Sequence, residues 1–232
     1  MAALPMQEAE PNILWTDVTK FVGQLNHDLR NHLNALELQA AFLNEIVAEP
    51  EAKEELKRLR EVTGEAGAAL QKLSSLLARI QPAPMTYRAS EFIEDLRSRL
   101  EREEAEQATT IEWKSSLGGE QLEVDPILLQ DAFLELFRNA FVHQRGPGAL
   151  VFEVRPAGEK IEFTLREPKT KFDNSMDGWG RRPLSRVRHG HYSLGLYRAR
   201  SIFEAHHGLF QAQFDSAASV LVTTVSLPIV PA

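Results

Sequence analysis

The chain of 232 residues contains no cysteine. It therefore has no disulfide and no thiolate ligand for a zinc ion, and this composition fits a reducing cytosol. Positive charge is also scarce, because 26 Lys and Arg residues stand against 33 Asp and Glu residues and leave a net charge of −7. Such a balance disfavours a general nucleic-acid-binding role. We expect a cytoplasmic protein with no nucleic-acid partner.

Long hydrophobic runs are missing as well. No apolar run reaches the roughly 20 residues that cross a bilayer, so the sequence predicts no membrane segment. Residues 1–11 carry acids and prolines in place of a basic stretch followed by an apolar core, which is unlike a signal peptide. With 43% hydrophobic and 25% charged residues, the chain has the balance of a globular protein with one large or two small domains.

Residues 12–82 have the pattern of two long helices. Apolar residues recur in steps of three and four from Val18 to Val47, and again from Leu56 to Ile80, so each set forms one stripe of a helix. Pro50 interrupts the pattern between the stripes, and the prolines at 82 and 84 end it. A short break between long helices predicts an antiparallel hairpin.

A lone hairpin buries only one face of each helix. Two hairpins packed together bury far more apolar surface, so we expect a homodimer built on a four-helix bundle. The alternative is that the hairpin packs against the rest of its own chain.

Residues 86–232 contain both helical patterns and β-strand patterns of apolar residues. Helical patterns cover 92–100, about 126–143 and about 194–206, with Asp125 as N-cap, Pro126 in the first turn and Gly208 at the end of the last helix. β-rich runs cover 110–113, 121–124, 150–155, 160–166, 209–214 and 219–227. The predicted class is α+β: a helical hairpin, then an α/β sandwich in which helices cover one mixed sheet.

His27 lies in the first helix, two residues after Leu25 and two before Leu29. At about 100° per residue it points away from the apolar stripe, toward solvent. Asp28 adjoins it, and Asn31 follows one turn later on the same face. An exposed imidazole is a usable nucleophile near neutral pH. An exposed histidine on a helix is usually an ordinary surface residue, so its surroundings in the sequence decide its meaning.

Those surroundings are His27-Asp28-Leu29-Arg30-Asn31, followed by an apolar run. The segment resembles the phosphoacceptor box of bacterial sensor histidine kinases. The resemblance implies that His27 takes the γ-phosphoryl group of ATP, that Asp28 holds the ring and accepts its proton, and that Asn31 positions water during dephosphorylation of a partner. His32 has no counterpart in that box and is expected at a surface or an interface.

The helix predicted at 126–143 carries Glu135, Asn139 and His143 at i, i+4 and i+8, on one face. Magnesium prefers oxygen ligands, and an imidazole one turn further can reach phosphates. The segment resembles the asparagine box of the histidine-kinase and gyrase-type ATPase superfamily. The resemblance implies that these three residues bind ATP and that Asn139 is a Mg²⁺ ligand. The alternative is an amphipathic core helix with its polar residues outward.

A later stretch, from Gly190 to Leu196, resembles the second glycine box of the same superfamily. The resemblance implies that Gly190, Leu194 and Gly195 approach the ATP phosphates at a helix N-terminus. Ser193 stands where the family has a glycine, and so does His207 at the end of the following helix.

The first glycine box departs from the family pattern, which is Asp-x-Gly-x-Gly after a strand. Glu167 stands in the place of the aspartate that receives the adenine amino group, and the glycines are absent. Asp177-Gly178-Trp179-Gly180 is a similar string about ten residues later. The surrounding loop, 169–188, is rich in Lys and Arg, which suits a polyphosphate, an acidic partner or a solvated loop.

Three functions are consistent with these motifs. The first is a histidine kinase core that phosphorylates His27 with ATP and Mg²⁺ and passes the group to the aspartate of a response-regulator receiver domain. The second is a histidine phosphotransferase or phosphatase whose C-terminal domain, 86–232, binds ATP weakly or not at all. The third is a dimeric adaptor without catalysis.

Overall fold

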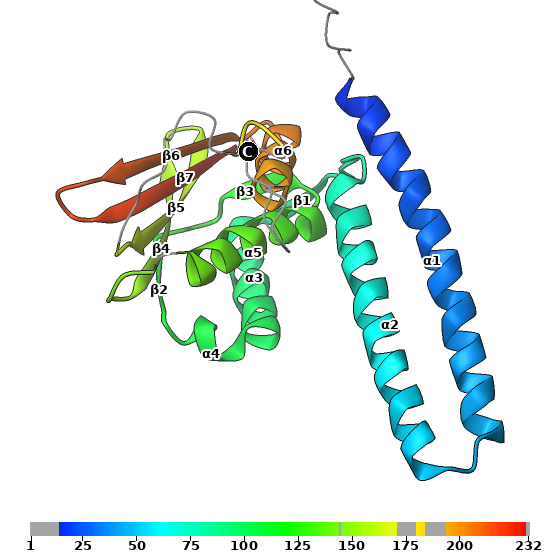
Figure 1. Cartoon of the computed structure of the whole chain (residues 1–232). Coiled ribbons are helices and arrows are strands. Elements are labelled where there is room, and N and C mark those ends of the chain that lie inside the picture. Colours follow the sequence, from blue (N-terminus) through cyan, green and yellow to red (C-terminus); the bar gives the residue numbers. More distant parts are fainter. Residues whose placement is uncertain (1–13, 144, 171–179, 184–193, 231–232) are drawn as a thin grey trace, which may run out of the picture. The chain divides into compact units, whose positions relative to one another are not determined.

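The computed structural model describes residues 14–143, 145–170, 180–183 and 194–230. The chain divides into two compact units, with the boundary between Ala78 and Arg79. Figure 1 shows the two helices of the first unit and the sheet and helices of the second. Each unit is described by itself.

The first unit is a hairpin of two helices, α1 (Trp15–Ile46) and α2 (Pro50–Leu77). Pro50 opens α2, because a proline is tolerated in the first turn, where its missing N–H has no helical partner. Asn26 bonds to Ser74, and Arg60 bonds to Glu37, so the helices run antiparallel. The predicted hairpin is thereby confirmed, including its break near residue 50.

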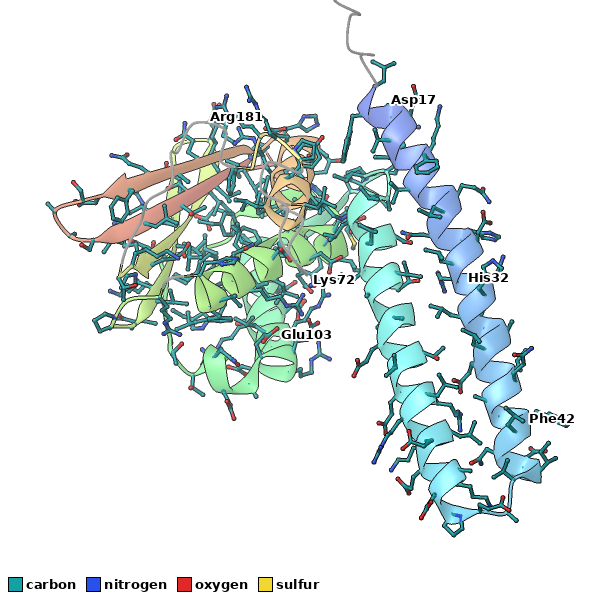
Figure 2. All side chains as sticks on the ribbon, viewed as in Figure 1. Asp17, His32, Phe42, Lys72, Glu103 and Arg181 are labelled. Atoms are coloured by element: carbon teal, nitrogen blue, oxygen red, sulfur yellow. The ribbon has the colours of Figure 1, made fainter. Side chains whose placement is uncertain are left out.

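This hairpin buries very few of its own side chains. Within its described residues, Asn26 and Ala40 of α1 and Thr63 of α2 are buried. Five of the apolar side chains of α1 are 40% to 67% exposed and, at about 100° per residue, lie within one arc of roughly 80°. They are Phe21, Leu25, Leu29, Leu36 and Leu43, and we call them the exposed stripe. Figure 2 shows the side chains along both helices.

The second unit contains a five-stranded sheet in the order β2-β4-β5-β7-β6. The strands are β2 (Ile111–Ser115), β4 (Leu150–Ala157), β5 (Lys160–Pro168), β6 (Leu209–Asp215) and β7 (Val220–Pro228). β2 pairs with β4 in parallel, and the other neighbours are antiparallel. The sheet is mixed, as predicted.

One predicted strand lies outside this sheet. β3 (Gln121–Val124) pairs with β1 (Met85–Arg88) in a separate two-stranded sheet. The expectation of a single sheet was therefore wrong. β1 was not predicted, and it supplies an antiparallel partner for all four residues of β3.

Helices α3 (Ala89–Glu103), α5 (Pro126–Val142) and α6 (Gly195–Ala205) cover one face of the large sheet, and the short α4 (Ala105–Ala108) follows α3 (Figure 1). Phe133 of α5 occupies the centre of the core between these layers. Its ring lies 5.0 to 5.9 Å from four other rings, in contacts typical of aromatic pairs. They belong to Phe92, Phe152, Phe163 and Phe203.

The end of α6 differs from the expectation in one residue. His207, and not Gly208, adopts the left-handed conformation, with φ of 59°. Gly208 serves close packing instead, since an added Cβ would lie 2.7 Å from the Leu227 side chain and 2.8 Å from the Phe203 carbonyl oxygen. In the part of the chain that is described, no helix is both long and apolar enough to span a bilayer.

Candidate functional site

The His27 side chain is 69% exposed on α1. Its Nδ1 atom lies 3.3 Å from an Asp28 carboxylate oxygen and 3.4 Å from the Asn31 side-chain amide nitrogen. With Nδ1 flanked in this way, Nε2 is the ring nitrogen that meets no hydrogen-bond partner among the described residues. The three residues that the motif singled out therefore form one exposed cluster, with Nε2 positioned to react with a group arriving from solvent.

Asn26 precedes this cluster and was not singled out from the sequence. It is 2% exposed, and its side-chain amide donates to the Ser74 hydroxyl of α2 at 3.2 Å. Buried polar groups of this kind fix the register of packed helices. The available signal was helical phase, because Asn26 shares a face with Val22 and Leu33, which are apolar.

In the second unit, helix α5 is fixed at its start by Asp125. One carboxylate oxygen accepts the backbone N–H groups of Ile127 and Leu128 at 3.1 and 3.0 Å, and the other accepts that of Ala83 at 3.1 Å. Burial alone would raise the pKa of Asp125, but these backbone hydrogen bonds outweigh it and lower the pKa below its ordinary value. The predicted N-cap is confirmed.

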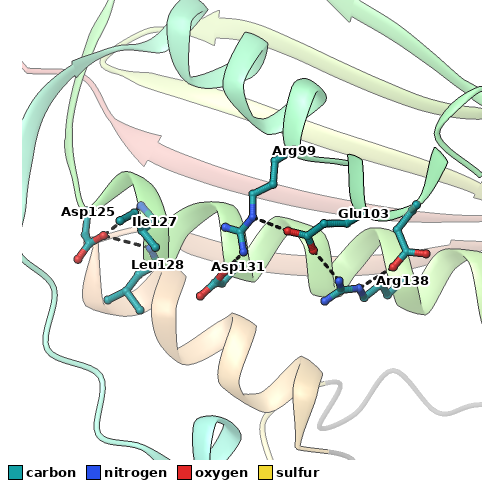
Figure 3. Close-up of polar contacts among 8 residues, drawn as sticks. Arg99, Glu103, Asp125, Ile127, Leu128, Asp131 and Arg138 are labelled. Carbon is teal, nitrogen blue, oxygen red and sulfur yellow. Dashed lines mark hydrogen bonds and ion pairs between the residues drawn. The ribbon is translucent and has the colours of Figure 1, made fainter. Parts of the chain in front are cut away.

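An ion-pair network fixes the outer face of α5 against α3 (Figure 3). Arg99 reaches Glu103 at 2.8 Å and Asp131 at 2.6 Å, while Arg138 reaches Glu103 at 2.7 Å. Burial raises the pKa of Glu103, but the two guanidinium groups outweigh it and leave the pKa lowered. The rotation of α5, and hence the direction of Asn139, follows from these contacts and from the aromatic core.

Asn139 and Glu135 interact one turn apart on α5. The Asn139 amide nitrogen donates to the Glu135 backbone oxygen at 2.7 Å and lies 3.3 Å from its carboxylate. The Glu135 carboxylate also lies against Gly195 at the start of α6, where an added Cβ would overlap it. The structure thus brings together Glu135, Asn139 and Gly195, three of the residues predicted for nucleotide binding. Leu194, just before them, is buried at 2% exposure.

Glu167 lies at the end of β5 and points to the same sheet face as Leu165, because alternate residues of a strand share a face. That face is covered by helices, so Glu167 is only 5% exposed. Lys169 follows two residues later, is 6% exposed and brings its Nζ atom to 2.7 Å from the Glu167 carboxylate. The same Nζ atom donates to the His143 backbone oxygen at 2.8 Å. Burial raises the pKa of Glu167, and the Lys169 ammonium opposes that shift.

A small pocket joins these groups. Its volume is about 60 Å³, and it is lined by residues of α5, β5, α6 and β7, among them Asn139, Glu167 and Thr223, and by His143 and Lys169, which directly follow α5 and β5. Pockets that hold cofactors usually measure about 300 to 1,000 Å³. This pocket is much smaller than that, and its lining includes three of the residues predicted for nucleotide binding, Asn139, His143 and Glu167.

The residues around this pocket fit Mg²⁺ and the phosphates of ATP, but they do not fit its base. The Asn139 side-chain oxygen makes no hydrogen bond within the described residues, and a single protein oxygen suits Mg²⁺, which keeps waters and phosphate oxygens as its other ligands. The first turn of α6, which has no side-chain cap, lies beside it. At the other end the Glu167 carboxylate is held by Lys169, which leaves no space for a base. Among the described residues no cluster of three or more His, Asp or Glu residues could hold a metal ion.

Some predicted features fall outside the described residues. These are Gly190, Ser193, the Asp177-Gly178-Trp179 string and most of the basic loop. Of that loop, Lys169 is described and is part of the buried pair, whereas Arg181 lines a second pocket with Arg200 and β6.

The sequence matches no known family model and no curated protein. The structure does resemble solved structures. Full-length ShkA in complex with AMPPNP is 16% identical, with a TM-score of 0.68 over 92% of this chain and 46% of ShkA. This chain thus spans about half the length of ShkA.

Two further solved structures are similar to this chain. The mycobacterial sensor histidine kinase MprB is 16% identical over 65% of this chain and 100% of that one, with a TM-score of 0.51. The Acinetobacter baumannii histidine kinase AdeS is 15% identical over 88% of this chain and 98% of that one, also with a TM-score of 0.51. The chain has the fold of a sensor histidine kinase core: a helical hairpin followed by an ATPase-type α/β unit.

Proposed function

We propose that this chain is a two-component signalling protein of the histidine kinase type, which carries a phosphoryl group on His27 and exchanges it with the aspartate of a response-regulator receiver domain. The likeness to sensor histidine kinases supports a kinase-type function. The observation that carries the proposal is the His27 cluster, where Asp28 and Asn31 flank Nδ1 and leave Nε2 exposed. Nε2 would form the N–P bond as the donor's P–O bond breaks.

The Asp28 carboxylate suits its role through position. It lies 3.3 Å from Nδ1, so it favours the tautomer with the proton on Nδ1 and the lone pair on Nε2. It also stabilises the imidazolium charge that develops when Nε2 attacks phosphorus. Asn31 is placed to orient a water molecule near the same ring when the phosphoryl group is removed from a receiver.

ATP is the first candidate donor. It is supported by the fold, by the AMPPNP bound to ShkA, and by the contact between Asn139, Glu135 and the start of α6. In this version the chain is a histidine kinase that phosphorylates itself. Its partners are Mg²⁺–ATP and a receiver domain.

A phosphorylated receiver domain is the second candidate donor. It is supported by the Glu167–Lys169 pair, which fills the predicted base position, and by the small volume of the pocket. In this version the chain is a phosphotransferase or phosphatase, and its second unit serves as a docking domain.

The test is a labelling experiment with both donors. Wild type, His27→Ala and the matched control His32→Ala are incubated with γ-labelled ATP and Mg²⁺, and separately with receiver domains labelled on aspartate. We expect an acid-labile label from one donor on wild type and His32→Ala, and none on His27→Ala. Equal labelling of His27→Ala, or no label from either donor, would overturn the proposal.

We further propose that the chain acts as a homodimer, with the exposed stripe of α1 as the interface. The few buried residues of the hairpin support this, because a second copy would cover the apolar side chains that remain in contact with water. Sedimentation velocity at micromolar concentration should show a dimer for wild type and for Asn34→Glu, which places a charge at an exposed polar position. Leu36→Glu places the same charge in the stripe and should give a monomer. A monomeric wild type would contradict the dimer.

A further inference from the structure

The Lys169 side chain occupies the pocket of the second unit from within. Its ammonium group is held between a Glu167 carboxylate oxygen at 2.7 Å and the His143 backbone oxygen at 2.8 Å. Both partners are acceptors, and one of them is charged. This corner of the pocket is therefore built to receive a group that carries at least two N–H donors.

Burial explains why the corner must be filled. The side chains of Lys169 and Glu167 are 4% and 7% exposed, and a buried carboxylate without a donor is strongly disfavoured. Lys169 satisfies it with no ligand present. Its alkyl chain also occupies space among α5, β5, α6 and β7, which leaves the pocket at about 60 Å³.

We propose that Lys169 is an internal occupant of an aminopurine site, with its ammonium in the position of the exocyclic 6-amino group of adenine. An aromatic amino group has two N–H donors, as the Glu167–His143 corner requires. A purine with a carbonyl oxygen at position 6 would instead bring an acceptor against the Glu167 carboxylate, which is repulsive. Removal of the Lys169 side chain therefore opens a site that is selective for 6-aminopurines. This inference rests on the proposal that the second unit is a nucleotide-binding type of domain.

The backbone around Lys169 keeps this arrangement in place. Gly146 donates its N–H to the Pro168 oxygen at 2.7 Å, and an added Cβ on Gly146 would lie 2.9 Å from the Lys169 carbonyl carbon. On the other side, Lys169 donates its own backbone N–H to the Ser219 oxygen at 2.8 Å. The segment is held on both sides, so the Lys169 side chain enters the pocket from a fixed point.

Calorimetry with ADP and IDP tests the inference, since the two ligands differ only at the N1–C6 edge of the purine: ADP has an amino group at position 6 and a bare N1, and IDP has a carbonyl oxygen at position 6 and a proton on N1. Lys169→Ala should bind ADP at least about ten-fold more tightly than wild type does, and should prefer ADP to IDP by a similar factor. Lys169→Arg keeps a cation in the corner and should show no gain. No gain in Lys169→Ala, or an equal gain for ADP and IDP, overturns the inference.

A second measurement covers a variant that folds poorly. n-Butylammonium can replace the lost side chain, so it should raise the thermal midpoint of Lys169→Ala and compete with ADP. Tetramethylammonium has the same charge and no N–H donor, and should do neither. Equal effects of the two cations would contradict the role of Lys169. None of these measurements involves His27. The inference about Lys169 can therefore be overturned while phosphoryl transfer through His27 is upheld, and transfer through His27 can be overturned while the inference about Lys169 is upheld.

Discussion

The amide of Asn26 donates to the hydroxyl of Ser74 across the hairpin at 3.2 Å, and Asn26 is the residue immediately before His27. This hydrogen bond lies in the interior of a hairpin that has few other buried side chains. It ties the segment of α1 that carries His27 to one position along α2.

Replacement of one partner in this pair should destabilise the hairpin. Ser74→Ala leaves the buried Asn26 amide without this acceptor, and we expect a loss of about 1 to 3 kcal/mol in the free energy of unfolding. The double variant Asn26→Leu/Ser74→Ala removes both polar groups and should recover most of that loss. Urea unfolding followed by far-ultraviolet circular dichroism, at one fixed protein concentration, measures both effects.

Ser75→Ala is the control, because the exposed Ser75 hydroxyl donates to the Lys72 backbone oxygen of its own helix. It should leave the unfolding curve nearly unchanged. If Ser74→Ala behaved like Ser75→Ala, the hydrogen bond would have no role in stability. The double variant should also transfer phosphoryl groups more slowly, since an apolar pair does not fix register.

Gly195 should not tolerate a side chain. An added Cβ overlaps the Glu135 carboxylate, so Gly195→Ala should destabilise the protein by about 1 to 3 kcal/mol, as overpacking does. Glu135→Ala in the same chain removes the obstacle and should restore most of the stability. The thermal midpoint of the single and double variants tests this coupling.

Gly119→Ala is the matched control for that substitution, because its Cβ meets nothing within 4 Å. It should leave the midpoint within about 0.5 kcal/mol of wild type. Additive effects of Gly195→Ala and Glu135→Ala would show that the two residues do not meet.

His207 should be improved by glycine. Its φ of 59° is left-handed, which costs a residue with a side chain about 1 to 2 kcal/mol. Glycine avoids this cost, but part of the gain is lost because glycine makes the unfolded chain more flexible. We expect His207→Gly to raise the free energy of unfolding by about 0.5 to 1 kcal/mol. Gly208→Ala should lower it, because the Cβ overlaps Leu227 and the Phe203 carbonyl. Chemical unfolding of both variants measures these changes. A destabilised His207→Gly would contradict the left-handed conformation of His207.

Asp125 should make stability depend on acid pH. Its pKa is lowered in the folded state, so the ionised cap stabilises the protein above the unfolded pKa of about 3.9, and this contribution is lost as the pH falls further. Asp125→Ala should lose about 1 kcal/mol near neutral pH and progressively less below pH 4. Asp125→Asn keeps one capping oxygen without titrating but loses the acceptor for the Ala83 N–H, so its stability near pH 7 should lie between those of wild type and Asp125→Ala, and its acid dependence should be weaker. Parallel curves for all three proteins would show that the carboxylate makes no such contribution.

Most elements were predictable because their signals are local. The stripes on each side of Pro50 predict the hairpin, and the Asp125-Pro126 pair marks the start of α5. Strands β4, β5 and β7 alternate between buried and less buried positions along most of their length. Such patterns depend only on the periods of helix and strand.

The features that escaped prediction depend on residues far apart in sequence. β1 is a four-residue strand that is defined by its pairing with β3. The Asn26–Ser74 bond joins positions 48 residues apart. In the site, separate motifs indicated Glu167 and Asn139. The entry of Lys169 into the same pocket depends on how β5 packs against α5. A strand period alone carries no information about that contact.

A pocket that is filled by the chain's own lysine changes which signal can control the protein. In the proposed phosphotransferase version, phosphorylation of His27 would then depend on the phosphorylation state of partner proteins, and the cellular ratio of ATP to ADP would not affect it. Under that proposal, the residue at position 169 would decide whether an adenine nucleotide can enter the pocket of the second unit.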